Sequence, residues 1–239
     1  MQLHIANLSL SQEKKTLCRE LNLSLNSGDI WGILGANGSG KTTFLHALVG
    51  LHFPLQGEIF LGDKNLKTLS RKIIARQIGL LFQDNKPTFP QSVFEYCLAG
   101  RHPHANYFSW ETADDYAATH AALAEMELTS LSRQNVQTLS GGEQQRLAIA
   151  TLLAQSPNIY LLDEPVNHLD LRHQIKVLTH FKQLAEKYSK TIMLAIHDIN
   201  LAQRYCNKIL MFLGNGEFLQ GNPEEVITAD NLQLSLIHI

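Results

Sequence analysis

Eight consecutive residues, Gly35-Ala-Asn-Gly-Ser-Gly-Lys41-Thr42, match the phosphate-loop pattern GxxxxGK[ST]. Glycines at these positions let backbone N–H groups turn inward around the β- and γ-phosphates of a nucleotide. Lys41 places a positive charge on the phosphates, and the hydroxyl of Thr42 can ligate Mg²⁺. The alternative is an ordinary glycine-rich turn, but an apolar strand precedes this one. We expect the nucleotide to contact Gly35, Ala36, Asn37, Gly38, Ser39, Gly40, Lys41, Thr42 and Thr43.

Two carboxylates end the apolar run Ile159-Tyr-Leu-Leu-Asp163-Glu164. In phosphoryl transfer one acid can hold Mg²⁺ through water, while a second acid polarises the attacking water. Asp163 suits the first role and Glu164 the second. Alternatively, the two residues are simply solvated acids at the junction of a strand and a loop. The acidic pair indicates catalysis only in combination with the phosphate loop.

A second glycine-containing run, Leu139-Ser-Gly-Gly-Glu143, lies about a hundred residues beyond the phosphate loop. Ser140 is a suitable N-cap for an apolar helix that continues through Leu153. Such a run could be no more than a helix start. A helix start with a serine and bare backbone N–H groups is, however, itself a site for an anion.

The elements that must position these residues follow from the spacing of apolar side chains. The order strand, helix, strand over 159–196 implies parallel pairing. We expect strands at 3–8, 21–25, 29–34, 57–62, 78–82, 159–162 and 191–196. We expect helices at 42–49, 92–98, 112–128, 140–153, 171–188 and 223–234, and a hairpin over 208–220 around the turn 214–216.

The residue pattern changes between about Lys86 and Asn158, where the spacing of apolar residues is helical and alanine is frequent. We therefore expect one α/β domain over residues 1–239. Its catalytic core would span about 1–85 and 159–239, and a helical insert would span about 86–158.

Composition narrows the classes of protein that the chain can belong to. With 239 residues, of which 44% are hydrophobic, it can bury a sizeable core. A net charge of −2 gives no support for bulk attraction to nucleic acid, and we expect no nucleic-acid partner. Cys18, Cys97 and Cys206 are far apart and read as reduced thiols. Without a membrane-length apolar run or a signal peptide, we expect a soluble, cytoplasmic chain.

The order of the motifs resembles that of the ABC (ATP-binding cassette) ATPase family over nearly the whole chain. The resemblance implies a P-loop NTPase core of the ABC ATPase type, with an N-terminal antiparallel β-subdomain and an inserted helical subdomain. It also implies ATP and Mg²⁺ as cofactors. The motifs that carry it are, in order, the phosphate loop at 35–42, a glutamine loop at Gln83, the signature Leu139-Ser-Gly-Gly-Glu143, the acidic pair Asp163-Glu164, the run His168-Leu-Asp170 and His197.

The resemblance implies a catalytic role for Gln83, Glu164 and His197. Gln83 would sense Mg²⁺ and water, sharing the metal with Thr42 and Asp163. His197 would contact the γ-phosphate and orient Glu164. Without the resemblance, Gln83 would read as a loop residue and His197 as a polar strand cap.

The resemblance also implies that each complete site needs two chains. Ser140, Gly141 and Gly142 would close over the γ-phosphate of ATP held by a second copy, and Asp170 would lie at the seam of this dimer. ATP would then hold the dimer together, and hydrolysis would release it.

One stretch departs from the family, which usually supplies an aromatic ring upstream of the phosphate loop to stack on adenine. This chain has no Phe, Tyr or Trp between Met1 and Ile30, and the matching stretch is Ser11-Gln-Glu-Lys-Lys-Thr-Leu17. Leu17 and the stems of neighbouring side chains would have to pack on the base instead. Since stacking on a base contributes roughly 1–3 kcal/mol, we expect weaker base affinity or looser purine selectivity, without loss of activity.

Two further runs, Gly100-Arg-His-Pro-His104 and Asn167-His-Leu-Asp-Leu-Arg-His-Gln174, resemble the ATPases of bacterial importers for iron-siderophore, haem and cobalamin chelates. In that group a coupling helix of a membrane permease docks on the helical insert, and a substrate-binding protein delivers the cargo. The resemblance places the chain at the cytoplasmic face of the inner (plasma) membrane. An HxH pair with no third ligand in register favours an exposed loop at His102 and His104 over a metal site.

Three other functions compete with import. An exporter subunit shares every catalytic motif. A soluble ABC factor acting on ribosomes or DNA typically carries two cassettes or a long coiled coil, and this chain shows neither. A regulator that binds nucleotide without hydrolysis is disfavoured because Glu164 and His197 are present.

Overall fold

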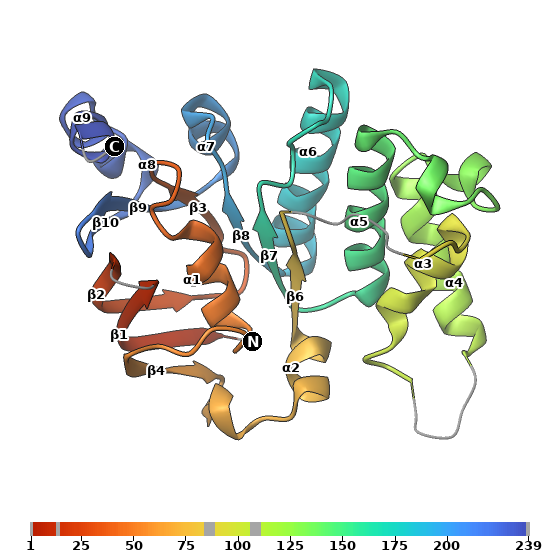
Figure 1. Cartoon of the computed structure of the whole chain (residues 1–239), viewed down its shortest axis with the longest axis horizontal. Coiled ribbons are helices and arrows are strands. Elements are labelled where there is room, and N and C mark those ends of the chain that lie inside the picture. Colours follow the sequence, from red (N-terminus) through yellow and green to blue (C-terminus); the bar gives the residue numbers. More distant parts are fainter. Residues whose placement is uncertain (1, 13–14, 84–88, 106–110, 238–239) are drawn as a thin grey trace.

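Six strands form the central sheet of the computed structural model, which describes residues 2–12, 15–83, 89–105 and 111–237. Five of the strands run in parallel, as the strand-helix-strand order predicts, and the sixth pairs antiparallel at one edge. In spatial order the strands are β10 (Glu217–Gly221), β9 (Lys208–Gly214), β3 (Ile30–Leu34), β8 (Thr191–Ala195), β7 (Ile159–Asp163) and β6 (Ile78–Leu81) (Figure 1).

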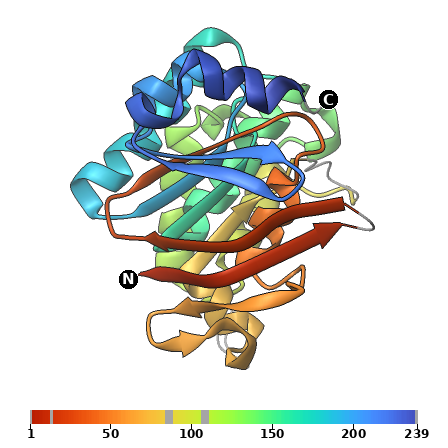
Figure 2. The same ribbon diagram turned by 90° about the vertical axis from the view of Figure 1, so that its left-hand side faces the viewer.

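A second, antiparallel sheet packs with helix α1 (Lys41–Leu48) against one face of the central sheet. Its strands face the viewer in Figure 2, with the helices of the insert behind them. Phe44 of α1 and Phe212 of β9 meet edge to face, with their ring centroids 5.6 Å apart. This sheet is the expected N-terminal β-subdomain, and its order is β2 (Lys15–Leu25), β1 (Leu3–Gln12), β4 (Gln56–Leu61) and β5 (Lys64–Asn65).

Helices cover the other face of the central sheet, among them α5 (Gly141–Gln155), α6 (Leu171–Tyr188) and α7 (Ile199–Tyr205). Successive residues of β7 alternate between the two faces: Leu161 packs toward α1, and Leu162 packs toward these helices. Because both faces are covered, the parallel strands are mostly apolar, which explains the apolar runs in the sequence.

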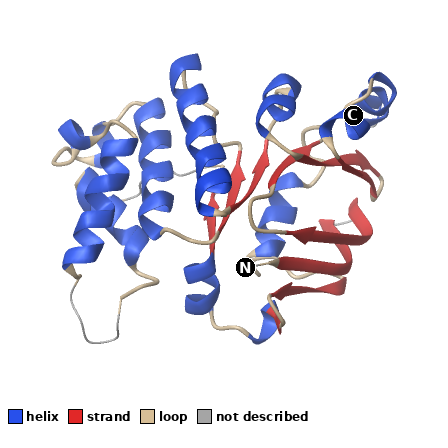
Figure 3. Cartoon of the chain, turned by 180° about the vertical axis from the view of Figure 1, so that it is seen from behind, coloured by secondary structure: helices blue, strands red, loops and turns tan. Residues whose placement is uncertain are grey.

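The helical insert consists of α3 (Val93–Leu98), α4 (Ala113–Glu125) and α5, which lie on the side of the molecule opposite to the antiparallel sheet (Figure 3). Helix α4 ends before the predicted Leu128, because Glu127 takes a left-handed conformation with φ of 56°. Helix α5 stops three residues before Asn158, the residue at which the sequence predicts the end of the insert. The boundary expected at residues 85 and 86 lies outside the described residues.

The single helix predicted over 223–234 is wrong, because the chain forms two helices there, α8 (Pro223–Val226) and α9 (Ala229–Ile237). Ile227 leaves the helical conformation, and the hydroxyl of Thr228 accepts a hydrogen bond from the Asn231 N–H at 3.3 Å. A threonine that caps a new helix competes with continuation of the first. Helices α2 (Arg71–Gln77) and α7 were not predicted, because each has only about two helical turns and its sequence shows too little periodicity.

None of the helices in the described part of the chain combines the length and the apolar character that crossing a membrane requires.

Candidate functional site

The phosphate loop joins the end of β3 to the start of α1, as its sequence predicts. Gly40 is the N-cap of α1 with φ of 105°, and a Cβ built there would lie 2.7 Å from Leu17 Cδ2. Only glycine can hold this left-handed position in such close contact. The chain therefore turns tightly and presents the first N–H groups of α1 to a ligand.

Lys41 and Ser39 are buried polar residues at the base of this loop. The Lys41 ammonium donates to the carbonyls of Gly35 and Ala36, at 2.9 and 3.1 Å. Burial lowers the pKa of Lys41, although the nearby carboxylates of Glu164 and Asp163 oppose this shift. Ser39 Oγ is buried and has no hydrogen-bond partner among the described residues. A buried hydroxyl of this kind costs free energy unless a ligand satisfies it.

Asp163 ends β7 with a side chain that is almost wholly buried, at 1% exposure. Neither of its carboxylate oxygens has a hydrogen-bond partner in the described part of the chain. Burial raises the pKa of Asp163, and the nearby Thr42 hydroxyl partly opposes this shift. Buried carboxylate oxygens beside a hydroxyl match the ligand preference of Mg²⁺, so the residues present fit this cation.

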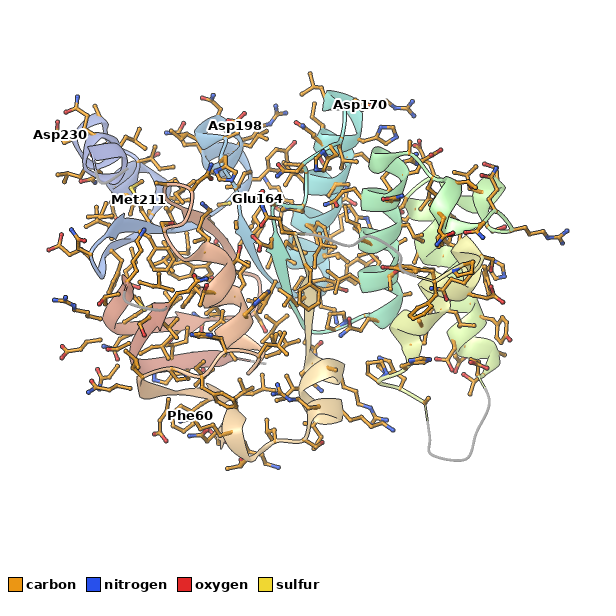
Figure 4. All side chains as sticks on the ribbon, viewed as in Figure 1. Phe60, Glu164, Asp170, Asp198, Met211 and Asp230 are labelled. Carbon is orange, nitrogen blue, oxygen red and sulfur yellow. The ribbon has the colours of Figure 1, made fainter. Side chains whose placement is uncertain are left out.

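Glu164 follows β7 directly, and three side chains surround it: Gln83 and His197 from distant segments, and Asn167 from the same loop. Gln83 Nε2 donates to Glu164 Oε2 at 2.9 Å, and the amide of Asn167 donates to the same oxygen. His197 Nε2 lies 2.5 Å from Glu164 Oε1. Glu164 adopts φ of 51°, a left-handed conformation that costs a non-glycine residue on the order of 1–3 kcal/mol and is frequent at functional sites. Figure 4 labels Glu164 near the centre of the molecule.

A cleft of about 600 Å³ connects the phosphate loop with Glu164. It brings together most of the catalytic and nucleotide-contacting residues that the sequence predicts, and it adds Gln12 and Asn167. Asn167 stands in a run that the sequence marks only as a resemblance to chelate importers, and nothing in one sequence shows that its amide faces Glu164. The lining residues are Gln12, Asn37, Gly38, Gly40, Lys41, Thr42, Thr43, Gln83, Glu164, Asn167 and His197.

The signature residues and Asp170 are not among the described residues that line this cleft. Ser140 is the N-cap of α5, as predicted, and forms a capping box with Glu143. The Ser140 hydroxyl lies 2.6 Å from Glu143 Oε2, and this hydrogen bond lowers the pKa of Glu143. Gly141 is exposed, and a Cβ built on it would meet nothing within 4 Å. The start of α5 is therefore open to a ligand that comes from outside the chain.

Asp170 caps α6 and accepts a hydrogen bond from the His173 N–H at 2.9 Å. This backbone hydrogen bond, followed by the one from the His173 ring, lowers the pKa of Asp170. Figure 4 shows Asp170 at the outer end of α6, away from Glu164. The structure thus places the predicted seam residue at the surface, as an assembly role requires.

The sequence favours an exposed loop over a metal site at His102 and His104, and in the structure His102 is exposed whereas His104 is half-buried. The His104 ring donates to the carbonyl of Gln155 at 2.8 Å, and Arg101 pairs with Asp115 at 2.7 Å. No group of three or more metal-ligating His, Cys, Asp or Glu side chains occurs among the described residues. The run from 100 to 104 ties the start of the insert to the end of α5.

Leu17 cannot pack on a nucleobase as the sequence suggested, since it is only 2% exposed and lies behind Gly40. Its period-2 position on β2 points it into the core. Gln12 faces the cleft instead, and its Oε1 accepts a hydrogen bond from the Thr43 hydroxyl at 2.9 Å. The sequence did not single out Gln12, because local periodicity does not determine which way a side chain at a strand end points.

Residues 18–167 match the family model described as ABC transporter, and the chain belongs to this family of transport ATPases. It is 36% identical to the petrobactin import ATP-binding protein FpuD of Bacillus anthracis, over 94% of this chain and 82% of the relative. The ferric enterobactin transport ATP-binding protein FepC of Escherichia coli is also 36% identical, over 95% of this chain and 83% of the relative. The hemin import ATP-binding protein HmuV of Bordetella pertussis is 33% identical, over 98% of this chain and 91% of the relative.

Solved structures of similar fold also belong to ABC proteins. A structure described as an inward-facing conformation of a metal-chelate type ABC transporter superposes with a TM-score of 0.85 at 33% identity, covering 99% of this chain and 89% of that one. A dimeric ATP-binding cassette bound to ADP and phosphate superposes with a TM-score of 0.80 at 27% identity, covering 92% and 98%. The chain is therefore an ATP-binding, ATP-hydrolysing subunit with the ABC fold.

Proposed function

We propose that this chain powers the import of a metal chelate, of the iron-siderophore, haem or cobalamin type, through a separate membrane permease. The observation that carries the proposal is similarity over nearly its full length to the ATP-binding proteins of petrobactin, enterobactin and hemin transport. The structural similarity to a metal-chelate type transporter supports it.

Within the chain, the cleft supports ATP hydrolysis by positioned groups. Lys41 and the N–H groups at the start of α1 would bind the β- and γ-phosphates. Thr42 and Asp163 would hold Mg²⁺, with Gln83 nearby, and the cation would neutralise charge on the phosphate oxygens. Glu164 would accept a proton from the attacking water. The side-chain amides of Gln83 and Asn167, which donate to its Oε2 atom, would hold the carboxylate in position for this role. His197, within hydrogen-bond distance of the other oxygen, would orient this base.

We further propose that two copies complete each site. The exposed start of α5, with Ser140, Gly141 and Gly142, would contact the γ-phosphate bound by the other copy. Asp170 would lie at the seam between them. The comparison with a dimeric cassette bound to ADP and phosphate supports this arrangement.

A permease is the second partner in the proposal. Phe82 and Phe89 are exposed apolar side chains at the junction of core and insert, at 41% and 74% exposure. Large exposed apolar side chains are common at protein interfaces. We propose that a coupling helix of the permease docks beside them, which holds this chain at the cytoplasmic face of the membrane. A substrate-binding protein would complete the system.

The test is to purify the Glu164→Gln chain from its native cells in mild detergent with ATP and to identify what accompanies it by mass spectrometry. We expect a polytopic permease and a substrate-binding protein for a chelate. If the accompanying permease transports its substrate out of the cell, the proposed function would change from import to export. Ribosomal or DNA-associated partners without a membrane protein would overturn the transport proposal and leave only the ATPase.

A further inference from the structure

Two groups of side chains line the cleft, and each would contact a different part of a bound nucleotide. Gln83, Asn167 and His197 gather around Glu164, which marks the end where the γ-phosphate is hydrolysed. Gln12 lines the same cleft from the antiparallel sheet and is hydrogen-bonded to Thr43, in the first turn of α1. With the triphosphate along the phosphate loop, the base and ribose therefore extend toward Gln12.

The wall around Gln12 offers hydrogen-bonding groups instead of a ring. Among the described residues that line the cleft there is no Phe, Tyr or Trp. Gln12 pairs with Lys15 across the end of the β1–β2 hairpin. The Lys15 ammonium is already bonded to the carbonyl of Gly38 at 2.8 Å. Among the described residues of this hairpin end, Gln12 is the one that lines the cleft, and its side chain is therefore placed to contact the base.

The hydrogen bond to Thr43 determines which half of the Gln12 amide a ligand meets. A carboxamide carries one acceptor oxygen and an NH₂ group with two donors. Because the Thr43 hydroxyl donates to Oε1, the NH₂ group is the part directed to other partners. A purine that lies against this wall therefore meets N–H donors.

We propose that Gln12 determines the base specificity of this ATPase by donating to the N7 and O6 edge of a purine. N7 is an acceptor in both adenine and guanine, whereas position 6 carries an acceptor oxygen in guanine and a donor NH₂ group in adenine. With an N–H donor at Gln12, the site should therefore bind guanine at least as tightly as adenine. The inference rests on the proposed placement of the triphosphate, and it replaces stacking by hydrogen bonding as the means of holding the base.

The test measures the affinities of ATP and GTP by equilibrium competition against a fluorescent ATP analogue on the isolated chain. In the wild type we expect the two dissociation constants to agree within about threefold. The isosteric variant Gln12→Glu can keep its bond with Thr43 but presents an acceptor, which repels O6 of guanine and accepts from N6 of adenine. The ratio of affinities should shift toward ATP by about fivefold to tenfold, the effect of one hydrogen bond.

Two variants serve as matched controls. Gln12→Tyr should tighten both nucleotides, because a ring stacks on any base, and it should shift their ratio toward ATP, because the NH₂ donor to O6 of guanine is lost. Lys15→Met changes the neighbouring residue of the same hairpin end and should leave the ratio unchanged, since its ammonium is bonded to Gly38. Both controls, and Gln12→Glu, are checked for folding by thermal unfolding.

The outcomes separate the two proposals. A wild-type chain that binds neither nucleotide, like the control Lys41→Ala, would overturn the proposed triphosphate site. Tight nucleotide binding with a wild-type preference for ATP above tenfold, or with the same ATP to GTP ratio in Gln12→Glu, would overturn the role of Gln12 and leave that site standing.

Discussion

Adjacent carboxylates at the end of β7 lie in opposite environments. Asp163 is buried, and its oxygens have no hydrogen-bond partner among the described residues, whereas both oxygens of Glu164 have partners. One strand end turns the first side chain into the sheet edge and the second into the cleft. A left-handed residue at Glu164 makes this turn possible. At the scale of the residue, the pair can therefore divide metal binding and proton transfer between them.

Replacing Glu164 by glutamine should slow ATP hydrolysis by roughly 10²–10⁴-fold, the usual contribution of a general base. ATP binding should persist, because Lys41 and the phosphate loop are unchanged, and an ATP-bound dimer should accumulate. Steady-state phosphate release and size-exclusion chromatography with ATP measure the two effects. Normal turnover in this variant would show that another group is the base.

Asp163→Asn should remove the Mg²⁺ dependence of nucleotide affinity. Groups that hold a metal through water typically account for 10–100-fold in its affinity. The ratio of ATP affinities measured with Mg²⁺ and with EDTA should therefore fall by about that factor. The substitution is isosteric, so its thermal unfolding midpoint serves as the control for folding. A ratio equal to that of the wild type would exclude Asp163 as a metal-binding residue.

The elements of the insert are joined by charged groups that the sequence did not reveal as partners. Arg101 bonds both Asp115 at the start of α4 and the carbonyl of Ala154 at the end of α5. The Thr112 backbone N–H, with help from Arg101 and the Thr112 hydroxyl, lowers the pKa of Asp115 to about 2. One guanidinium thus fixes the position of α4 relative to α5. The signature lies at the start of the same helix α5. The contact of Arg101 with the end of α5 therefore also helps to position the signature.

The pH dependence of Asp115 tests this contact. Because its pKa is depressed in the folded chain, ionised Asp115 contributes stability above about pH 4, and this contribution is lost as the pH falls toward 2. We expect Asp115→Asn to cost about 1–2 kcal/mol at pH 7, as weakened caps and ion-paired hydrogen bonds do. Urea unfolding of both proteins at decreasing pH should show this difference shrinking below pH 4. A difference independent of pH would refute the assignment.

At the scale of the whole molecule, the two halves of the predicted site lie apart. The phosphate loop and Glu164 share one cleft, while the signature at the start of α5 lies outside it. A single chain therefore holds a nucleotide-binding half and an exposed complementary half. This division is the geometry expected of a chain that pairs with a second copy.

Ser140→Arg should abolish hydrolysis while the isolated chain binds ATP as before. The bulky cation would obstruct the start of α5, where the second copy's γ-phosphate is proposed to bind, but it lies outside the chain's own cleft. Equilibrium binding and phosphate release separate the two steps. Glu143→Ala removes the partner in the same capping box and reports how much thermal stability belongs to the cap, about 1 kcal/mol. Loss of ATP binding in monomeric Ser140→Arg would contradict the division between copies.

The sequence by itself determined the parallel core, the phosphate loop, the acidic pair and the N-cap at Ser140, because local periodicity and local backbone chemistry encode them. It could not show that Asn167 joins Gln83 and His197 around Glu164, because Gln83 and His197 lie 81 and 33 residues from Glu164 along the chain, and the direction of the Asn167 side chain depends on the fold of its loop. It also placed Leu17 and the stems of neighbouring side chains against the base, although Leu17 is buried in β2 and Gln12 faces the cleft. Direction of a side chain at a strand end depends on which sheet packs behind it, and only the tertiary structure decides that.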